Sequence, residues 1–302
     1  MRLPMSERPI RPQRIMLLGA QGQVGVALAR TLPALGTVEA CDRARVDLAS
    51  AAAIRSAVRE LAPDIIVNAA AYTAVDRAES EAELALAING EAPGILAEEA
   101  RNANALLVHY STDYVFDGTK ADAYLEGDAT HPLGAYGRSK LAGEQAIQAV
   151  GGAHLIFRTS WVYSHHGANF MKTMLRLAGE RDHLRVVADQ IGAPTSSNAI
   201  AQATARCLTC YLSATQAGLD GLYHMSCGGK TSWHGFATEI FAQFLSQDHR
   251  ARIKVEPIST DAYPTPAQRP RNSVLSNAKL LARFGVGLPD WQVALQQIDA
   301  QA

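Results

Sequence analysis

The chain has 302 residues, of which 48% are hydrophobic and 19% are charged, and its formal net charge is −1 at pH 7. This composition indicates a globular protein with one large domain or two unequal ones. A nearly neutral chain offers no broad electrostatic attraction to nucleic acid or to an anionic membrane, so we expect neither partner. No apolar run approaches the roughly 18 residues that a membrane span requires.

Residues 1–13, MRLPMSERPIRPQ, are basic and rich in proline but lack the apolar segment of a secretory signal, so we expect a mobile extension. The chain has four cysteines without a disulfide-like pattern, which favours a reducing, cytoplasmic compartment. Cys207 and Cys210 have the spacing of half a zinc site but lie in an apolar helical pattern. The adjacent His165 and His166 have no ligand at a matching spacing, so we expect no metal ligand in either motif.

From Arg14 onward, short apolar runs alternate with longer amphipathic ones, which predicts an α/β fold with a Rossmann-type doubly wound parallel sheet. The runs that we interpret as buried strands of this sheet are RIMLLG, VEACD, DIIVNAA, ALLVHYST, HLIFRTSWVY and LRVVAD. We place this domain at residues 14–190. The segments QIGAPTSSN, GLYHMSCGG and RIKVEPIST then indicate a smaller, substrate-binding lobe, residues 191–302, with some segments returning to the core.

The first predicted strand is followed at once by GAQGQVG, in which Gly19, Gly22 and Gly25 have the spacing G-x-x-G-x-x-G before an apolar helix. Small residues at these positions let the backbone turn tightly and bring helix N–H groups close to a pyrophosphate. The sequence therefore predicts a dinucleotide site. A glycine-rich turn without a ligand is the alternative.

The second predicted strand ends at Asp42, whose carboxylate can accept hydrogen bonds from an adenosine ribose and so favours NADH. Arg43 and Arg45 follow and can meet a 2′-phosphate, so NADPH stays equally open. Small residues after the third strand, in NAAAYT, would let a ring or ribose lie against the backbone, unless they only pack against a helix. The expected cofactor-binding residues are Gly19, Gln21, Gly22, Gln23, Val24, Gly25, Asp42, Arg43, Asp47, Leu48, Ala70, Ala71, Tyr72, Thr73, Asn89, Tyr136 and Lys140.

The fourth predicted strand ends in HYSTDYVFDG, which brings Thr112 to the same sheet edge as the glycine turn. Tyr136 and Lys140 follow in YGRSK, four residues apart and therefore on one face of a helix. A lysine cation lowers the pKa of a phenol from about 10 and makes proton transfer feasible near neutral pH. We therefore predict that Thr112, Tyr136 and Lys140 are catalytic.

These segments, with FRTSWVY, DQIGAPT and YPTPAQRPRNSVL, resemble the extended short-chain dehydrogenase/reductase family and, within it, the dTDP-4-dehydrorhamnose reductases, from about Ile15 to Leu295. The resemblance implies reduction of the C4 keto group of dTDP-4-dehydro-β-L-rhamnose to dTDP-L-rhamnose, a precursor of cell-surface polysaccharides, by NADPH or NADH. It implies that Tyr136 donates the proton, that Lys140 activates it and holds the ribose, and that Thr112 positions the tyrosine. The expected substrate-binding residues are Thr112, Asp113, Trp161, Asn169, Arg269 and Arg271.

Similar reductases include some that dimerise around a magnesium ion held by glutamates, one of them in the helix after the glycine turn. This chain reads GVALAR there, so Mg²⁺ is disfavoured, while a homodimer stays open. Two alternatives remain. One is another nucleotide-sugar enzyme of the same fold, an epimerase or a dehydratase. A dehydratase would need an additional acid–base pair, commonly Asp-Glu, beside Thr112, but Asp113 is followed by Tyr114. A non-catalytic NADP-binding subunit, as of methionine adenosyltransferase, would not need an intact Tyr136 and Lys140.

Overall fold

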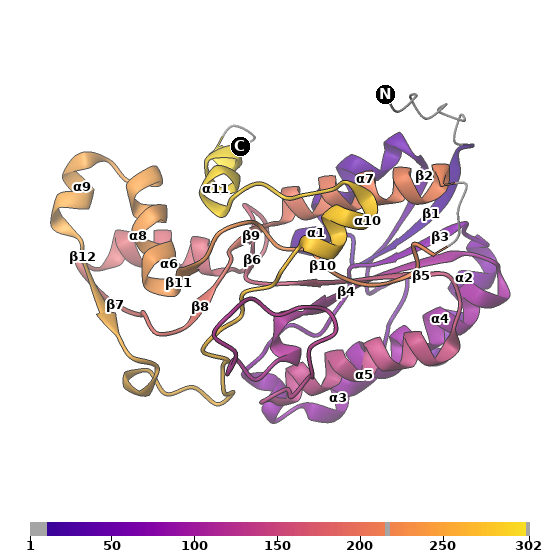
Figure 1. Cartoon of the computed structure of the whole chain (residues 1–302), viewed down its shortest axis with the longest axis horizontal. Coiled ribbons are helices and arrows are strands. Elements are labelled where there is room, and N and C mark those ends of the chain that lie inside the picture. The colour runs from indigo at the N-terminus through magenta and orange to yellow at the C-terminus, as the bar shows by residue number, and fades with distance from the viewer. Residues whose placement is uncertain (1–10, 215–217, 300–302) are drawn as a thin grey trace.

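The protein combines a large α/β part with a smaller lobe beside it (Figure 1). The structure is a computed structural model that describes residues 11–214 and 218–299. Most of the extension expected at residues 1–13 lies outside these ranges, and Gln13 already begins the first strand. No helix among the described residues is long and apolar enough to cross a membrane.

The large part is built on a six-stranded parallel sheet in the order β10-β5-β4-β3-β1-β2. The chain forms β2 on one side of β1 and then returns to form β3 on the other side, so the direction of winding reverses between β1 and β3. Parallel sheets bind ligands at the carboxyl ends of the strands beside such a reversal. The strands are β1 (Gln13–Leu18), β2 (Gly36–Cys41), β3 (Ile65–Asn68), β4 (Leu106–Thr112), β5 (His154–Thr159) and β10 (Gly221–His224).

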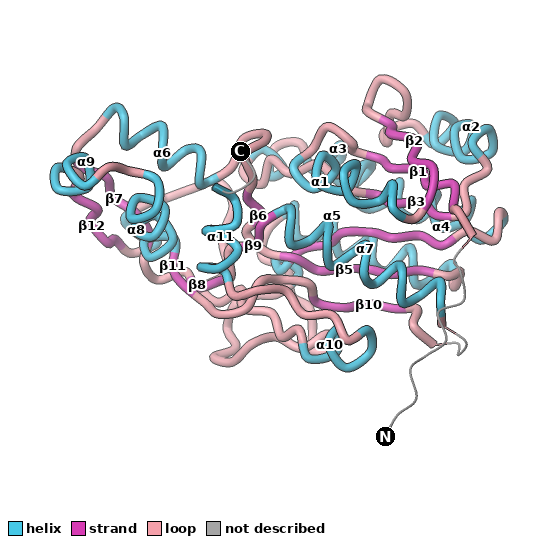
Figure 2. The backbone as a smooth tube through the Cα atoms, turned by 90° about the horizontal axis from the view of Figure 1, so that it is seen from above, coloured by secondary structure: helices cyan, strands magenta, loops and turns pink. Residues whose placement is uncertain are grey.

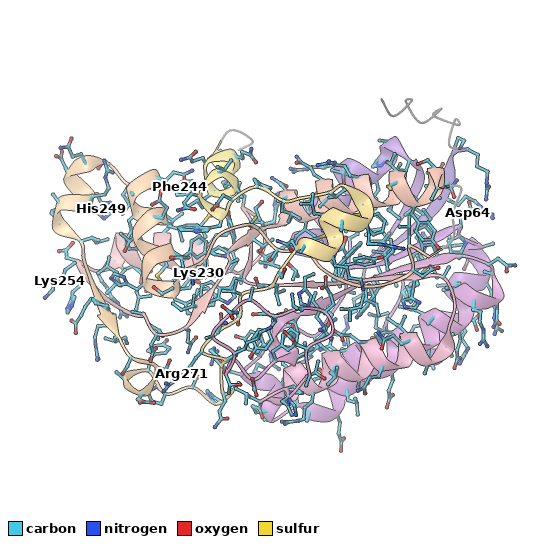
Figure 3. The ribbon with its side chains drawn as sticks, in the orientation of Figure 1. Asp64, Lys230, Phe244, His249, Lys254 and Arg271 are labelled. Atoms are coloured by element: carbon cyan, nitrogen blue, oxygen red, sulfur yellow. The ribbon has the colours of Figure 1, made fainter. Side chains whose placement is uncertain are left out.

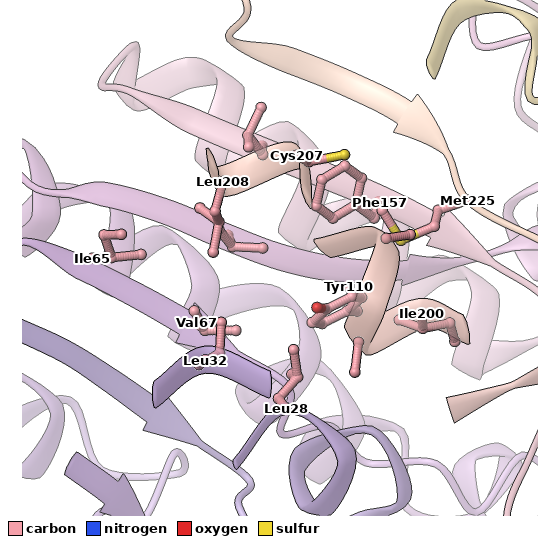
Figure 4. Close-up of a cluster of buried hydrophobic side chains, with 14 of the residues drawn as sticks. Leu28, Leu32, Ile65, Val67, Tyr110, Phe157, Ile200, Cys207, Leu208 and Met225 are labelled. Carbon is pink, nitrogen blue, oxygen red and sulfur yellow. The ribbon is translucent and has the colours of Figure 1, made fainter. Parts of the chain in front are cut away.

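Helices cover both faces of this sheet, as the two views show (Figures 1 and 2). Side chains alternate along β1, so that Ile15 and Leu17 join one hydrophobic cluster while Met16 and Leu18 join the other. Figure 4 shows the first cluster, where α1, α7 and the sheet meet and where Cys207 is buried. The first face carries α1 (Gln23–Thr31), η1 (Leu32–Ala34), α7 (Ser197–Ser213) and α10 (Ala278–Phe284); the second carries α2 (Ala51–Leu61), α4 (Ala92–Asn102) and α5 (Ala135–Val150), with α3 (Ala82–Leu86), η2 (Arg77–Glu79), the π-turn η3 (Ala87–Glu91) and η4 (Asp113–Val115) nearby.

The smaller lobe has its own core, in which aromatic side chains of α8 and α11 pack against methionines of α6. Two short strands, β7 and β12, pair in parallel beside them. The remaining short strands, β6 with β9 and β8 with β11, lie between the lobe and the sheet. The elements are β6 (Val162–Tyr163), α6 (Phe170–Glu180), β7 (His183–Val187), β8 (Ile191–Gly192), β9 (Thr195–Ser196), β11 (Thr231–Ser232), α8 (Trp233–Phe244), α9 (Gln247–Arg252), β12 (Lys254–Ile258), η5 (Thr260–Ala262) and α11 (Trp291–Asp299).

The doubly wound fold is confirmed, but one strand assignment is wrong. The run LRVVAD forms β7, which pairs with β12 in the smaller lobe and not with the central sheet. The sixth strand of the sheet is instead β10, from the GLYH run that we assigned to the lobe. The reason is that both runs are short and apolar, and only long-range packing decides which sheet a short strand joins.

A buried ion pair joins α5 to the sheet. Arg158 of β5 donates from Nε and Nη2 to the two carboxylate oxygens of Glu144 at 2.8 and 2.6 Å. The two side chains are only 4% and 2% exposed. Charges removed from water in this way are tolerated because each is paired in a bidentate geometry.

We predict that Arg158→Met lowers the free energy of unfolding by about 3–5 kcal/mol, because Glu144 is left buried without its cation. Urea denaturation measures this change. The control is Arg176→Met, which breaks the exposed pair between Arg176 and Glu180 and is expected to cost less than about 1 kcal/mol. Equal losses in the two variants would show that the buried pair has no special importance.

Candidate functional site

A groove of ≈ 680 Å³ runs along the carboxyl ends of the strands. It is lined by the glycine turn after β1, by the residues that follow β2 and β3, by the end of β4 and by the first turns of α5. All the cofactor-binding residues predicted from the sequence line it except Gly25 and Asn89. The groove therefore brings together segments that lie far apart along the chain.

The glycine turn depends on two close approaches. Gly19 has φ +73°, and a Cβ there would lie 2.6 Å from the backbone nitrogen of Ala70. A Cβ on Gly25 would lie 2.0 Å from the carbonyl oxygen of Gly19, so this glycine packs α1 against the turn instead of lining the groove. No described side chain caps the helix at Gly22, which leaves N–H groups of its first turn for a phosphate.

Asp42 is held in place at the end of β2. Its two carboxylate oxygens accept hydrogen bonds from Gln21 Nε2 at 2.9 Å and from the backbone N–H of Arg45 at 3.1 Å. Arg43 is 78% exposed, and its Nε lies 3.9 Å from Asp47 Oδ1. A carboxylate for a ribose and a free-moving guanidinium for a phosphate are thus both present at one end of the groove.

Asn89 does not line the groove but supports the segment after β3 that does. It is buried in the π-turn, where its Oδ1 accepts from the backbone N–H of Tyr72 and its Nδ2 donates to the carbonyl oxygen of Tyr72, both at 2.9 Å. The same Nδ2 donates to Ser139 Oγ of α5 at 3.1 Å. Asn89 therefore ties the segment after β3 to the helix that carries Tyr136 and Lys140.

Tyr136 and Lys140 lie one turn apart at the start of α5 and both line the groove. Thr112, at the end of β4, lies near the Tyr136 phenol and lowers its pKa, while its Oγ1 donates to Asp113 Oδ1 at 3.0 Å. The ring of Tyr114 packs edge-on against Tyr136 with 5.6 Å between centroids. The structure thus assembles the predicted Thr-Tyr-Lys group at the sheet edge.

The expected lowering of the phenol pKa by Lys140 is not seen. Burial raises the pKa of Tyr136 to about 12, although the neighbouring Thr112 hydroxyl acts in the opposite direction. Lys140 Nζ instead donates to the carbonyl oxygen of Tyr110 at 2.6 Å and lies 3.2 Å from His109 Nε2. Burial also lowers the pKa of Lys140 to about 8, against the attraction of Glu144. The expectation from the sequence considered the ammonium charge but not the burial of the phenol, which opposes loss of the proton.

Two buried hydroxyls line the groove without a hydrogen-bond partner in the described part of the chain. They are Ser111 Oγ and Thr159 Oγ1. Thr159 ends β5 directly beside Thr112 of β4. Buried polar atoms without partners are rare in proteins, so these two fit a polar ligand in the groove. Our sequence analysis missed Thr159, although its position at the end of a predicted strand was a usable signal.

The predicted substrate residues lie around the groove, and none of them lines it. Asp113 is buried, and burial raises its pKa to about 6. Trp161 stacks on Trp233 of α8 with 3.5 Å between ring centroids and 7° between ring planes. Asn169 caps α6, and its Nδ2 donates to Gln23 Oε1 of the glycine turn at 2.9 Å. Trp161 and Asn169 thus connect the smaller lobe to the groove.

Arg269 and Arg271 lie in YPTPAQRPRNSVL, residues 263–275, which we call the proline-rich segment. The two arginines differ in their surroundings. Arg269 donates from Nη2 to Asp76 Oδ2 at 2.8 Å, so it fastens this segment to the loop after β3. Arg271 is exposed, and Figure 3 shows it on the segment that runs between the smaller lobe and the large part. Its carbonyl oxygen accepts from the backbone N–H of Ile191 at 2.8 Å. At Arg271 the backbone therefore anchors the segment, whereas at Arg269 the guanidinium does.

Comparisons with known proteins agree on one family. The profile of a family described as "RmlD substrate binding domain" matches residues 13–302. The chain is 50% identical to a dTDP-4-dehydrorhamnose reductase of Burkholderia thailandensis, over 93% of this chain and 96% of that one. It is 45% identical to a protein of the same name from Escherichia coli K12, over 94% and 96%. A crystal structure of dTDP-4-dehydrorhamnose reductase from Bacillus anthracis in complex with NADP superposes with a TM-score of 0.89, at 34% identity over 96% and 100% of the two chains.

Proposed function

The chain belongs to the dTDP-4-dehydrorhamnose reductase family, and we propose that it reduces the C4 keto group of dTDP-4-dehydro-β-L-rhamnose to give dTDP-L-rhamnose, with NADPH or NADH as the reductant. The observation that carries this proposal is the placement of Thr112, Tyr136 and Lys140 at the sheet edge beside the glycine turn. A bound nicotinamide cofactor would supply the hydride. The chain would supply binding, orientation and the proton.

The residues present fit such a cofactor. The glycine turn and the first turn of α1 would hold the pyrophosphate, and Asp42 or Arg43 would meet the adenosine ribose. The groove is about large enough for a ligand of this class. The hydroxyls of Ser111 and Thr159 have no hydrogen-bond partner among the described residues and would gain one from a polar ligand.

The proton would come from Tyr136. Its phenol lies near Thr112 and is protonated at neutral pH, because burial raises its pKa. Lys140 lies one turn further along the same helix face. In its charged form it would stabilise the phenolate that remains after the proton has moved to the C4 oxygen. Thr112 keeps the phenol oriented throughout, which is the main requirement for a general acid.

We propose that the smaller lobe binds the sugar nucleotide, because Trp161 stacks on Trp233 of α8 and Asn169 at the start of α6 reaches Gln23 of the glycine turn. A boundary at residue 190, with residues 191–302 as the lobe, would leave α6 and β7 of the lobe core in the other domain and would assign β10 of the sheet to the lobe. The four free thiols support a reducing, cytoplasmic location, and a net charge near zero supports the absence of a nucleic-acid partner. A homodimer is an assembly that the family resemblance supports.

We predict that Tyr136→Phe lowers turnover of dTDP-4-dehydrorhamnose by roughly 10²–10⁴-fold, because the positioned acid is lost. Nicotinamide absorbance measures the rate, and calorimetric titration with NADPH serves as the control, since cofactor affinity should change little. A UDP-linked keto sugar should react poorly with the wild type. Near-normal turnover by the variant would mean that another group protonates the C4 oxygen, and failure of the wild type with every nucleotide sugar would refute the proposed function.

We predict that Asp42→Ala shifts the preference toward NADPH by about tenfold or more, because the ribose loses a charged acceptor and a 2′-phosphate loses a repelling charge. Arg43→Ala should shift it toward NADH. Ratios of kcat/KM for the two cofactors measure both effects. The control is Glu60→Ala, which removes an exposed carboxylate of α2 that does not line the groove. Unchanged ratios in both test variants would place the discriminating groups elsewhere.

We predict that Arg271→Ala raises the KM for the dTDP sugar about tenfold or more, equivalent to ~1.4 kcal/mol of lost binding to the diphosphate, without changing NADPH affinity. We expect the same for Arg269→Ala. Asp76→Asn tests whether Arg269 acts only by attaching the segment to the loop after β3. If that is its only role, Asp76→Asn and Arg269→Ala should raise the KM equally. Arg185→Ala, an exposed arginine of β7, is the control. If both test arginines could be removed without a change in KM, the diphosphate would have to bind elsewhere.

A further inference from the structure

Two buried polar residues lie on the side of Lys140 that faces away from the groove. His109 of β4 and Asn68 at the end of β3 are each only 1% exposed, and neither lines the groove. Asn68 Nδ2 lies 3.1 Å from His109 Nδ1, and His109 Nε2 lies 3.2 Å from Lys140 Nζ. The three side chains therefore form one continuous chain of polar contacts that ends at the groove.

The backbone fixes the orientation of the Asn68 amide. Asn68 Oδ1 accepts a hydrogen bond from the backbone N–H of Ala70 at 3.2 Å. A backbone N–H can only donate, so the amide oxygen must face Ala70 and the NH₂ group must face His109. His109 Nδ1 consequently accepts. A neutral imidazole whose Nδ1 accepts carries its proton on Nε2, the nitrogen that points at Lys140.

The imidazole thus presents a donor to Lys140 Nζ. An ammonium group has only donors, so a charged Lys140 would meet His109 donor against donor. An uncharged amine has a lone pair that can accept the hydrogen from Nε2 while it still donates to the carbonyl oxygen of Tyr110. The hydrogen bonds of this network are complete only when Lys140 is uncharged.

We propose that Asn68 and His109 are positioning residues that favour the uncharged form of Lys140 and so place the loss of its proton within the pH range in which the enzyme works. The test of this inference that measures kcat rests on the proposed reductase function. The pair acts through oriented dipoles, because burial and the neighbouring Lys140 hold the pKa of His109 well below its usual value. Burial of Lys140 lowers its pKa in the same direction.

The other groups around Lys140 do not replace this effect. On α5, Glu144 attracts the ammonium charge, but it is engaged in the bidentate pair with Arg158 of β5. Tyr136, on the same helix, stays neutral because burial raises its pKa. From β4, Tyr110 contributes its carbonyl oxygen, which accepts from either form of the amine. The choice between charged and uncharged lysine therefore depends strongly on which His109 nitrogen carries the proton.

The first test reads the tautomer directly and needs no turnover. Protein labelled with ¹⁵N-histidine is studied by NMR without cofactor, and comparison with His109→Gln assigns the His109 signals among the nine histidines. We expect a neutral ring protonated on Nε2. A ring protonated on Nδ1, or on both nitrogens, at neutral pH would overturn the proposal. This result stands even if the protein fails to reduce the dTDP sugar, so the two failures can be told apart.

The second test reverses the network by exchanging one heavy atom, the amide nitrogen of Asn68, for oxygen. In Asn68→Asp, one carboxylate oxygen still accepts from Ala70 while the other accepts from His109 Nδ1, which moves the imidazole proton to that nitrogen. Nε2 then accepts from a charged Lys140. We expect the NMR signature of the Nδ1–H tautomer. We also expect the alkaline limb of kcat, the pH range in which kcat falls as Lys140 loses its proton, to move upward by about one pH unit or more, which corresponds to a tenfold gain in the proton affinity of Lys140. A switched tautomer with an unshifted limb would overturn the proposal.

Two controls separate the tautomer from other effects. In the double variant Asn68→Asp with His109→Leu, the carboxylate remains but the imidazole does not, and we expect most of the shift to disappear. A full shift in the double variant would mean that the new charge acts alone, which would overturn the proposal. Thr204→Val removes the buried hydrogen bond between Tyr110 and Thr204 on the opposite face of β4, and its limb should match the wild type.

Discussion

A buried lysine that no carboxylate contacts in the described part of the chain is the constraint on which the rest of the site depends. Lys140 is 1% exposed, and its Nζ contacts a carbonyl oxygen and an imidazole. A positive charge there is poorly solvated, so small changes in its surroundings change its proton affinity strongly. The nearby Glu144 is held by Arg158, which keeps the acid from forming a direct pair with the lysine. The site therefore keeps a lysine whose charge can change, where a simple salt bridge would fix it.

The sequence predicted the features that local pattern determines. The glycine turn, Thr112 and the Tyr136–Lys140 pair each follow a strand or begin a helix, and parallel strands bring such positions to one edge. Features that depend on long-range packing could not be predicted in this way. The run LRVVAD joined the smaller lobe while GLYH completed the sheet, and no local signal distinguishes them. The raised pKa of Tyr136 also depends on burial, which the spacing of two residues does not reveal.

The large part and the smaller lobe are joined by contacts that also border the groove. Asp76 in the loop after β3 holds Arg269 of the proline-rich segment, and Asn169 at the start of α6 reaches Gln23 of the glycine turn. These polar contacts link the two parts on either side of the strand ends. A ligand that occupies the groove would therefore meet both parts at once, and movement of the lobe would change the position of groove residues.

The stack of Trp161 on Trp233 gives the protein an internal optical reporter. The chain has three tryptophans, and the third, Trp291, belongs to the core of the smaller lobe. Tryptophan emission therefore arises entirely from the lobe and its border, and the sheet that forms most of the groove contributes none of it. Two indoles in face-to-face contact absorb and emit as a coupled pair, so any rearrangement that separates them changes the spectrum without an added dye.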